Sequence, residues 1–209
     1  ANCVLKSRKI MFHKILIFAN LTTFRYIRAI DYTKAMRRKP IVALIYDFDG
    51  TLSPGNMQEF GFIQAIGKTP EEFWKMSDGI AAGQDASNIL AYMKLMFDEA
   101  KNNGIRLKRS EFKKFGKDIK LFDGVTGWFD LVNEYGRSHG VKVEHYINSS
   151  GLKEIIEGCP IAKEFKHIFA SSFIYDQKGE AEWPGISVDY TAKTQFIFKI
   201  NKGIFSARD

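Results

Sequence analysis

Two aspartates, Asp47 and Asp49, end an apolar run in the stretch "IVALIYDFDGTLSPGN" at 41–56. Residues two apart on an extended chain share a face, and Gly50 then lets the backbone turn away. One carboxylate so placed can attack a phosphorus atom, while the other handles protons for the leaving group and then for water. Two such acids repel each other unless a cation neutralises them, and Mg²⁺ suits a site of carboxylate oxygens. Asp47 and Asp49 therefore predict a magnesium-dependent phosphoryl-transfer site, with solvated turn-forming acids as the alternative interpretation.

Two further polar residues are predicted to reach the same place. Ser149 ends the run "VEHYIN", and Lys193 lies at the start of a helical pattern in "TAKT" at 191–194. A serine hydroxyl and the adjacent backbone amides can hold phosphate oxygens, and a lysine can offset the charge that develops. Taken alone, Ser149 or Ser150 is explained better as the N-cap of the next helix, and Lys193 as an exposed helix residue.

The elements that must position these residues follow from hydrophobic periodicity. Residues 41–48 are typical of a strand buried on both faces, because the run is continuously apolar up to its first acid. Further strands are predicted over 141–150 and 165–176, a short hairpin within 179–190, and helices over 124–140, 151–159 and 191–203. This alternation favours an α/β fold with a doubly wound parallel sheet, in which ligands bind outside the carboxyl ends of the strands.

A helical pattern interrupts the alternation between residues 59 and 118. Thr69 is predicted to be an N-cap with Pro70 at the first helical position, and a second helix is predicted within 87–104. A third, weaker helix has Ser110 near its start. We expect a small helical domain inserted into a core formed by residues 40–58 and 119–209. Its basic residues that could contact an anionic substrate, but are explained better as solvated, are Lys75, Lys94, Arg106 and Arg109.

At these motifs the chain resembles the haloacid-dehalogenase-like (HAD) phosphatase superfamily, and within it the phosphoserine-phosphatase-like branch with a helical cap. "DFDGT" at 47–51 matches the first motif, "INSSG" at 147–151 the second, and "TAKT" fits the third. The resemblance implies a Rossmann-like core, a Mg²⁺ cofactor and Asp47 as the nucleophile that forms an aspartyl-phosphate. It implies that Asp49 is the general acid/base and that its backbone carbonyl ligates Mg²⁺. Ser149 would bind the phosphoryl group and Lys193 would stabilise it.

The same resemblance implies a phosphomonoesterase that acts on a small phosphorylated metabolite. Asp49 favours phosphoryl transfer over carbon–halogen cleavage, because the dehalogenases of the superfamily lack that acid. The substrate itself is not predicted by any residue of the insertion. The residues expected to bind the substrate adjoin the first two motifs and are Gly50, Thr51, Ser149, Ser150 and Gly151.

One departure from the family pattern concerns its fourth motif, an acidic Gly-Asp-x-x-x-Asp type sequence on the next strand. After Lys193 the chain offers "TQFIFKINKGIFSARD", whose Asp209 is the last residue. We therefore expect a core that is incomplete at its C-terminus, a weakened metal site, and an unpaired edge at the 41–48 strand. The alternative function is an inactive HAD-like fragment that binds phosphate or a partner only.

The distribution of charge and the number of cysteines limit the binding partners and the cellular location that we expect. Residues 1–40 hold ten Lys and Arg against Asp31, whereas the rest of the chain holds 21 basic and 23 acidic residues. A nucleic-acid or membrane-surface binder would rest on 1–39 alone, so neither partner is expected. Met36 opens a convincing protein start, and we expect 1–39 to be an upstream or non-native leader outside the fold, with export as the alternative. Cys3 and Cys159 form no metal or disulfide motif, which favours the cytoplasm.

Overall fold

A mixed five-stranded sheet forms the centre of the computed structural model, which describes residues 15–19 and 39–208. Its strands, in spatial order, are β1 (Ile15–Ala19), β2 (Ile41–Tyr46), β3 (Lys142–Leu152), β4 (His167–Tyr175) and β5 (Ala181–Ile186). Strands β2, β3 and β4 are parallel, whereas β1 and β5 run antiparallel to their neighbours. The predicted α/β class is confirmed, and the parallel part of the sheet contains the three strands that the apolar runs indicated.

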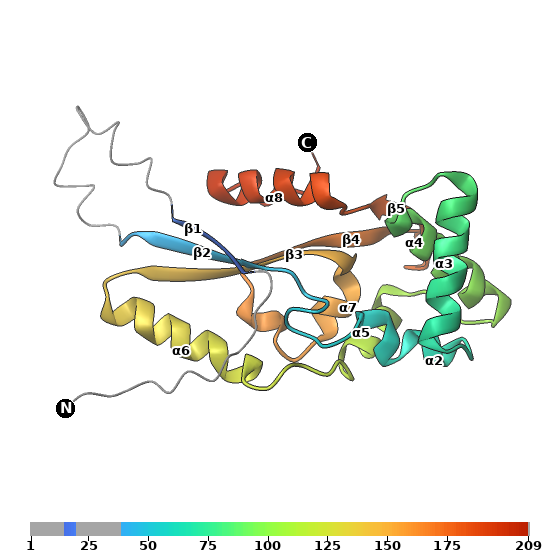
Figure 1. Ribbon diagram of the computed structural model, residues 1–209, viewed down its shortest axis with the longest axis horizontal. Coiled ribbons are helices and arrows are strands. Elements are labelled where there is room, and N and C mark those ends of the chain that lie inside the picture. Colours follow the sequence, from blue (N-terminus) through green and yellow to red (C-terminus); the bar gives the residue numbers. More distant parts are fainter. Residues whose placement is uncertain (1–14, 20–38, 209) are drawn as a thin grey trace.

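Helices cover both faces of this sheet (Figure 1). α6 (Val125–Ser138) and α7 (Lys153–Gly158) lie on one face, and α8 (Tyr190–Lys202) lies on the other. A short 3-10 helix, η3 (Ala162–Glu164), leads into β4. The predicted doubly wound arrangement is therefore confirmed, since the helices after β2 and β3 lie opposite the helix after β5.

The alternation of side chains along each strand produces two hydrophobic clusters. Ile45 and Tyr146 point to the α8 face, where Phe196 packs against them. Their neighbours Tyr46 and Ile147 point to the opposite face and pack with Phe129 of α6. Both clusters are buried, so each strand contributes to two layers, as the continuous apolar run at 41–46 indicated.

A chain of hydrogen bonds crosses the α6 face beneath the end of β2. Trp128 Nε1 donates to the Tyr46 hydroxyl at 2.9 Å, and that hydroxyl donates to His145 Nδ1 at 2.8 Å. His145 Nε2 lies 3.2 Å from Asn133 Oδ1, so the neutral ring carries its proton on Nε2. Burial lowers the pKa of His145 to about 4, which keeps the ring neutral at physiological pH. His145 is therefore a neutral residue of the core.

The helical insertion follows β2 and contains most of the remaining helices. They are η2 (Met57–Phe60), α2 (Phe62–Ala65), α3 (Pro70–Gln84), α4 (Asn88–Asn102) and α5 (Arg109–Gly116). Thr69 is the predicted N-cap of α3, because its side chain accepts from Glu72 N at 3.2 Å. The Glu72 carboxylate accepts in return from Thr69 N at 2.8 Å, which completes a capping box. Ser87 caps α4 through a single hydrogen bond, because its hydroxyl oxygen accepts from Leu90 N at 3.4 Å.

Helix α5 packs directly against α7 through a pair of glycines. A Cβ at Gly116 would lie 2.1 Å from the Ile155 carbonyl oxygen, and one at Gly158 would lie 1.9 Å from the Lys113 carbonyl oxygen. Backbone atoms cannot move aside as a flexible side chain can, so a larger residue at either glycine would separate the helices. That residues 59–118 act as a cap remains a prediction, but the last helix of this segment packs on the core.

The expected leader contributes one element to the sheet. β1, at residues 15–19, pairs along the whole of β2, from Ile15 opposite Tyr46 to Ala19 opposite Val42. The expectation that all of 1–39 lies outside the fold is therefore wrong for this strand, and β2 is not an unpaired edge. The rest of the leader up to residue 38 lies outside the described residues.

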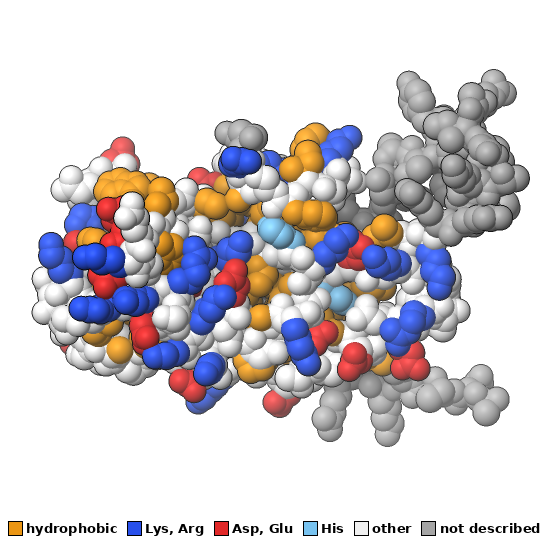
Figure 2. Space-filling view, turned by 180° about the vertical axis from the view of Figure 1, so that it is seen from behind, with side chains coloured by type: hydrophobic (Ala, Val, Ile, Leu, Met, Phe, Trp, Pro, Cys, Tyr) orange, Lys and Arg blue, Asp and Glu red, His pale blue; other side chains and the backbone are white. Residues whose placement is uncertain are grey.

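The face of the molecule drawn in Figure 2 shows no strong segregation of charge. Basic and acidic side chains are interspersed over the face seen in Figure 2, as the near balance of charge in residues 41–209 leads one to expect. Among the described residues, no helix combines the length and the apolar character needed to cross a membrane.

Candidate active site

The carboxyl end of β2 brings Asp47 together with a residue 146 positions later in the chain. Lys193 Nζ lies 2.8 Å from Asp47 Oδ2, and Phe48 N donates to the other carboxylate oxygen at 2.9 Å. Side-chain exposure is 21% for Lys193 and 18% for Asp47, so the ion pair is partly shielded from water. The alternative of Lys193 as an ordinary exposed helix residue is therefore wrong.

Lys193 reaches Asp47 because the start of α8 is fixed by two polar contacts. Asp189 is the N-cap, and its carboxylate accepts from Ala192 N at 2.8 Å. Asn148 on β3 donates from Nδ2 to the Lys193 carbonyl oxygen at 2.8 Å. Sequence reasoning missed both residues. Asp189 had a usable signal, since an aspartate immediately before a helical pattern is a typical N-cap, whereas Asn148 had none.

Asp49 lies in the tight loop that follows β2. Gly50 has a φ of +68°, and the carbonyl oxygen of Phe48 accepts from Leu52 N at 2.9 Å, which turns the chain back. The Asp49 carboxylate accepts from Met57 N at 2.9 Å. Burial is the main cause that raises the pKa of Asp49 to about 8, and the Met57 hydrogen bond opposes it. A carboxyl with this pKa is mostly protonated at neutral pH.

Ser149 and Gly151 lie at an irregularity where the pairing of β3 with β4 shifts register. Ser149 is fully buried, and its hydroxyl oxygen accepts from Gly151 N at 3.0 Å. A Cβ on Gly151 would lie 2.1 Å from Met57 Cε and 2.9 Å from Asp49 Oδ2, so a larger residue there would have to displace the ends of these side chains. Neither Ser149 nor Ser150 caps α7, whose N-cap is Leu152, and the capping alternative is wrong.

Two of the backbone amides expected to bind phosphate, those of Gly50 and Thr51, are occupied by hydrogen bonds within their loop. Gly50 N donates to the Ser53 carbonyl at 2.8 Å, and Thr51 N donates to the Phe48 carbonyl at 3.2 Å. Binding of a phosphate by these amides would require them to exchange those bonds. We use the name strand-end cluster for the four side chains that the sequence singled out as catalytic, which are Asp47, Asp49, Ser149 and Lys193.

The oxygen donors of the strand-end cluster fit a magnesium ion in kind. Mg²⁺ is usually held by one or two carboxylates, with waters and substrate phosphate completing its shell. The Asp47 carboxylate and the Asp49 backbone carbonyl are oxygen donors of this type, and both residues follow directly after β2. Among residues 15–19 and 39–208, no group of three or more His, Cys, Asp or Glu side chains is arranged to hold a metal.

A cavity of about 170 Å³ lies between this cluster and the insertion, and we call it the cap cavity. Asp49 and Gly151 line it from the core, and helices α3 and α4 line it from the insertion. Tyr92 of α4 ties the two sides together, because its hydroxyl donates to the Ser150 carbonyl at 2.7 Å. The four basic residues considered from the sequence do not line this cavity.

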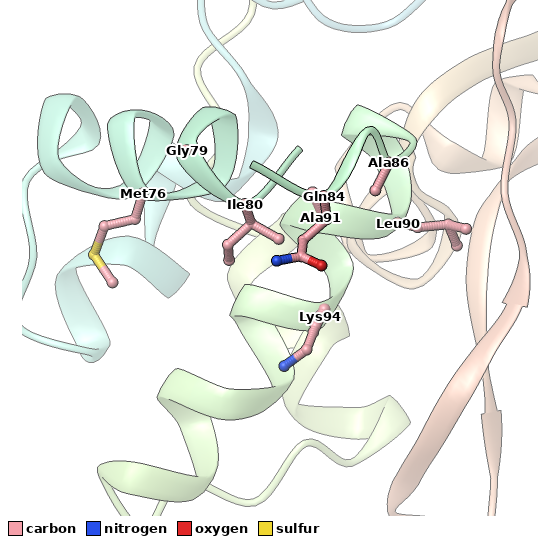
Figure 3. A pocket seen from close by; sticks show the side chains of 8 residues that line it. All are labelled: Met76, Gly79, Ile80, Gln84, Ala86, Leu90, Ala91 and Lys94. Atoms are coloured by element: carbon pink, nitrogen blue, oxygen red, sulfur yellow. The ribbon is translucent and has the colours of Figure 1, made fainter. Parts of the chain in front are cut away.

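A larger groove of about 730 Å³ lies elsewhere on α3 and α4 (Figure 3). Its lining is mostly apolar, from Met76, Ile80 and Leu90 among others. Lys94 also lines it, and this lysine is paired with Asp98. No residue of the strand-end cluster lines the groove, so size alone does not indicate the reactive site.

Comparison with known proteins gives one sequence relative and several similar folds. No family model matches the chain. An uncharacterized protein of Borreliella burgdorferi is 30% identical over 198 residues, which covers 80% of this chain and 67% of the relative.

The solved structures are more distant in sequence. A phospho-aspartyl intermediate analogue of phosphoserine phosphatase matches with a TM-score of 0.52 and 17% identity, over 80% of this chain and 74% of that one. A HAD family hydrolase of Salmonella enterica serovar Typhi matches with a TM-score of 0.54 and 10% identity, over 78% and 52%. These similarities establish the fold.

Proposed function

This chain belongs to the same family as the uncharacterized protein of Borreliella burgdorferi and has the fold of the haloacid-dehalogenase-like hydrolases, and on this premise we propose that it hydrolyses phosphate monoesters. The observation that supports the proposal best is the 2.8 Å ion pair between Asp47 and Lys193 at the carboxyl end of β2. It joins a nucleophile and a cation from distant parts of the chain at the sheet edge where α/β folds bind ligands.

In the proposed reaction, one oxygen of Asp47 attacks the phosphorus atom of the ester. The bond from phosphorus to the alcohol oxygen breaks, and Asp49 gives that oxygen its proton, so that the alcohol leaves neutral. A water then attacks the aspartyl-phosphate and passes a proton back to Asp49. Inorganic phosphate leaves and the Asp47 carboxylate is restored.

The other members of the strand-end cluster would hold the phosphoryl group. Lys193 already touches the Asp47 carboxylate, and its charge would offset the negative charge that develops on phosphoryl oxygens. The Ser149 hydroxyl would donate to one of those oxygens, with Gly50, Thr51, Ser150 and Gly151 as neighbouring backbone donors. Mg²⁺, when held by the Asp47 carboxylate and the Asp49 carbonyl, would supply further neutralisation of phosphate charge.

The proposed substrate is a small phosphorylated metabolite, and we expect the protein to act in the cytoplasm without a nucleic-acid or membrane partner. The cap cavity supports a small substrate, because its 170 Å³ is below the range of about 300–1,000 Å³ typical of drug-sized ligands.

Phosphate release by the purified full chain is the direct test, with and without Mg²⁺. We expect turnover of simple phosphate monoesters that Asp47→Asn abolishes and Lys193→Gln strongly reduces. Asp98→Asn is the matched control, because it makes the same acid-to-amide change in an exposed residue of α4. Acid-quenched protein should carry one phosphoryl group by intact mass, and Asp47→Asn protein should not. Phosphate binding without turnover would instead support the alternative of a binding protein.

A further inference from the structure

The cap cavity contains chemistry that the hydrolysis mechanism does not use. Under the proposed function, the phosphoryl group lies at Asp47 and the rest of the substrate extends toward α3 and α4. The cavity there has a volume of about 170 Å³, which corresponds to the space of about five or six water molecules. A short alcohol part of the substrate would fill this space.

The charge of the cavity wall from the insertion is negative. Asp78 lines the cavity at its exposed side, and no Lys or Arg of the described chain lines it. A second carboxylate, Glu59, lies directly behind the wall, because it accepts from Trp74 Nε1 and from Asn56 Nδ2, both at 2.7 Å. A substrate carboxylate would meet repulsion here, whereas a substrate cation would be attracted.

The same wall contains a hydrogen-bond acceptor that has no donor. Gln58 lines the cavity and is only 2% exposed. Its Oε1 is buried without a hydrogen-bond partner among the described residues. A buried acceptor left unpaired is costly, and a ligand N–H would satisfy it. The unpaired Gln58 oxygen is independent of the charge of Asp78, and both features favour a ligand that carries a cationic N–H group.

Two aromatic rings complete the wall. Trp74 and Tyr92 both line the cavity, with ring centroids 6.1 Å apart in an edge arrangement. Aromatic faces attract ammonium groups, and the attraction grows when the cation is shielded from water. A negative charge, an unpaired hydrogen-bond acceptor and aromatic rings are together the features of a site that binds an amine.

We propose that the substrate is a short aminoalkyl phosphate, a phosphate monoester whose alcohol carries an ammonium group and no carboxylate. The ammonium group lies between Asp78 and the rings of Trp74 and Tyr92 and donates to Gln58 Oε1. This inference rests on the proposed phosphatase function and adds the class of alcohol that it releases.

Three esters that differ by one group test the inference on the purified full chain with Mg²⁺. Phosphoethanolamine has the ammonium, 2-hydroxyethyl phosphate replaces it with a hydroxyl, and phosphoserine adds a carboxylate. We expect kcat/KM for phosphoethanolamine to exceed that for either of the others by about tenfold or more, since one well-made pocket contact commonly discriminates at this level. Equal or better turnover of phosphoserine or of 2-hydroxyethyl phosphate would overturn the inference and leave the phosphatase function intact.

Variants of the wall distinguish recognition of the amine from a general effect on the fold. Asp78→Asn and Gln58→Leu should each lower kcat/KM for phosphoethanolamine more than for 2-hydroxyethyl phosphate. Asp85→Asn is the matched control, because Asp85 ends the same helix, lies outside the cavity lining and has a positive φ that asparagine tolerates. A preference for the amine that survives both wall variants would contradict the assignment. Absence of turnover with all three esters would contradict the phosphatase function and the inference together.

Discussion

The strand-end cluster adjoins the cap cavity through Asp49, and the two regions differ in how their polar groups are paired. In the cluster, Asp47 is paired with Lys193, Asp49 accepts from Met57 N, and the Ser149 hydroxyl accepts from Gly151 N. Across the cavity, Gln58 Oε1 is buried without a partner and Asp78 faces no cation in the lining. The first region is held in place by the protein before any ligand arrives, whereas the second requires a ligand to complete it. Changes in the first should therefore affect kcat, and changes in the second should affect discrimination between substrates.

The largest expected effect is on the chemical step. Asp49→Asn keeps the shape of the side chain and an oxygen for Met57 N, but it removes proton transfer. We expect kcat to fall by about 10²–10⁴-fold, the usual contribution of general acid–base catalysis. Steady-state kinetics on phosphoethanolamine measure this effect. A variant with normal kcat and a changed substrate preference would show that Asp49 acts in substrate recognition rather than in the chemical step.

The next effect is on stability and comes from the hydrogen-bonded chain that supports β2. The pKa of His145 is lowered from 6.5 to about 4 in the fold, so the unfolded chain binds the proton first as pH falls. The stabilisation is complete above pH 6.5 and is lost between pH 6.5 and 4, with a total of about 3 kcal/mol. The raised pKa of Asp49 has the opposite effect, because it makes the folded state more stable as pH falls through this window. The contributions of Asp49 and His145 to the free energy of unfolding therefore partly cancel in the wild type.

The measurement therefore compares the wild type with His145→Gln by urea unfolding across pH 7 to 4, in EDTA. We expect the difference in free energy of unfolding to shrink as pH falls, because only the wild type has this histidine. A difference that stays constant with pH would mean that His145 titrates normally in the folded protein.

A smaller effect should follow from crowding the contact between Gly151 and Asp49. Gly151→Ala should destabilise the protein by about 1–3 kcal/mol, the typical cost of overpacking, and should also lower kcat. Gly127→Ala is the control, because a Cβ there meets no atom within 4 Å. In a Met57→Ala background, Gly151→Ala should cost less stability, because the contact with the methionine is gone, but it should lower kcat as before, since the contact with Asp49 Oδ2 remains. Loss of both effects in that background would show that only Met57 is sensitive to the change.

The smallest effect concerns the insertion alone. Thr69→Ala removes the capping box of α3 and should lower the free energy of unfolding by about 1 kcal/mol. Because Thr69 touches neither region, the ratio of kcat/KM between phosphoethanolamine and 2-hydroxyethyl phosphate should stay the same. A change in this ratio would show that the stability of α3 contributes to recognition of the substrate.

The sequence predicted the strand-end cluster because its signals are local. An apolar run that ends in Asp47 and Asp49 places both at a strand end, and the same holds for Ser149. Lys193 could be added because helices follow strands in a fixed order in this class of fold. The structure brings Lys193 to Asp47, while the catalytic roles of these residues stay predictions until the variants are measured.

The cap cavity could not be predicted in the same way. Gln58, Trp74 and Asp78 belong to segments that look like ordinary amphipathic helix and loop, and burial of Gln58 depends on how α3 and α4 pack over the core. The strand at 15–19 was missed for a related reason, because its pairing with β2 depends on contacts far along the chain. The cap cavity and the pairing of β1 with β2 both depend on packing between segments far apart in the sequence. Hydrophobic periodicity within a short window carries no information on such packing.

The glycine contact between α5 and α7 has a mechanical consequence. Because these backbones touch at Gly116 and Gly158, we expect α5 to stay with the core in any movement of the insertion. Access of a substrate to Asp49 would then depend on α3 and α4, whose connections lie at 66–69 and 103–108. The hydrogen bond from the Tyr92 hydroxyl to the Ser150 carbonyl would have to break before these two helices could move away from the core.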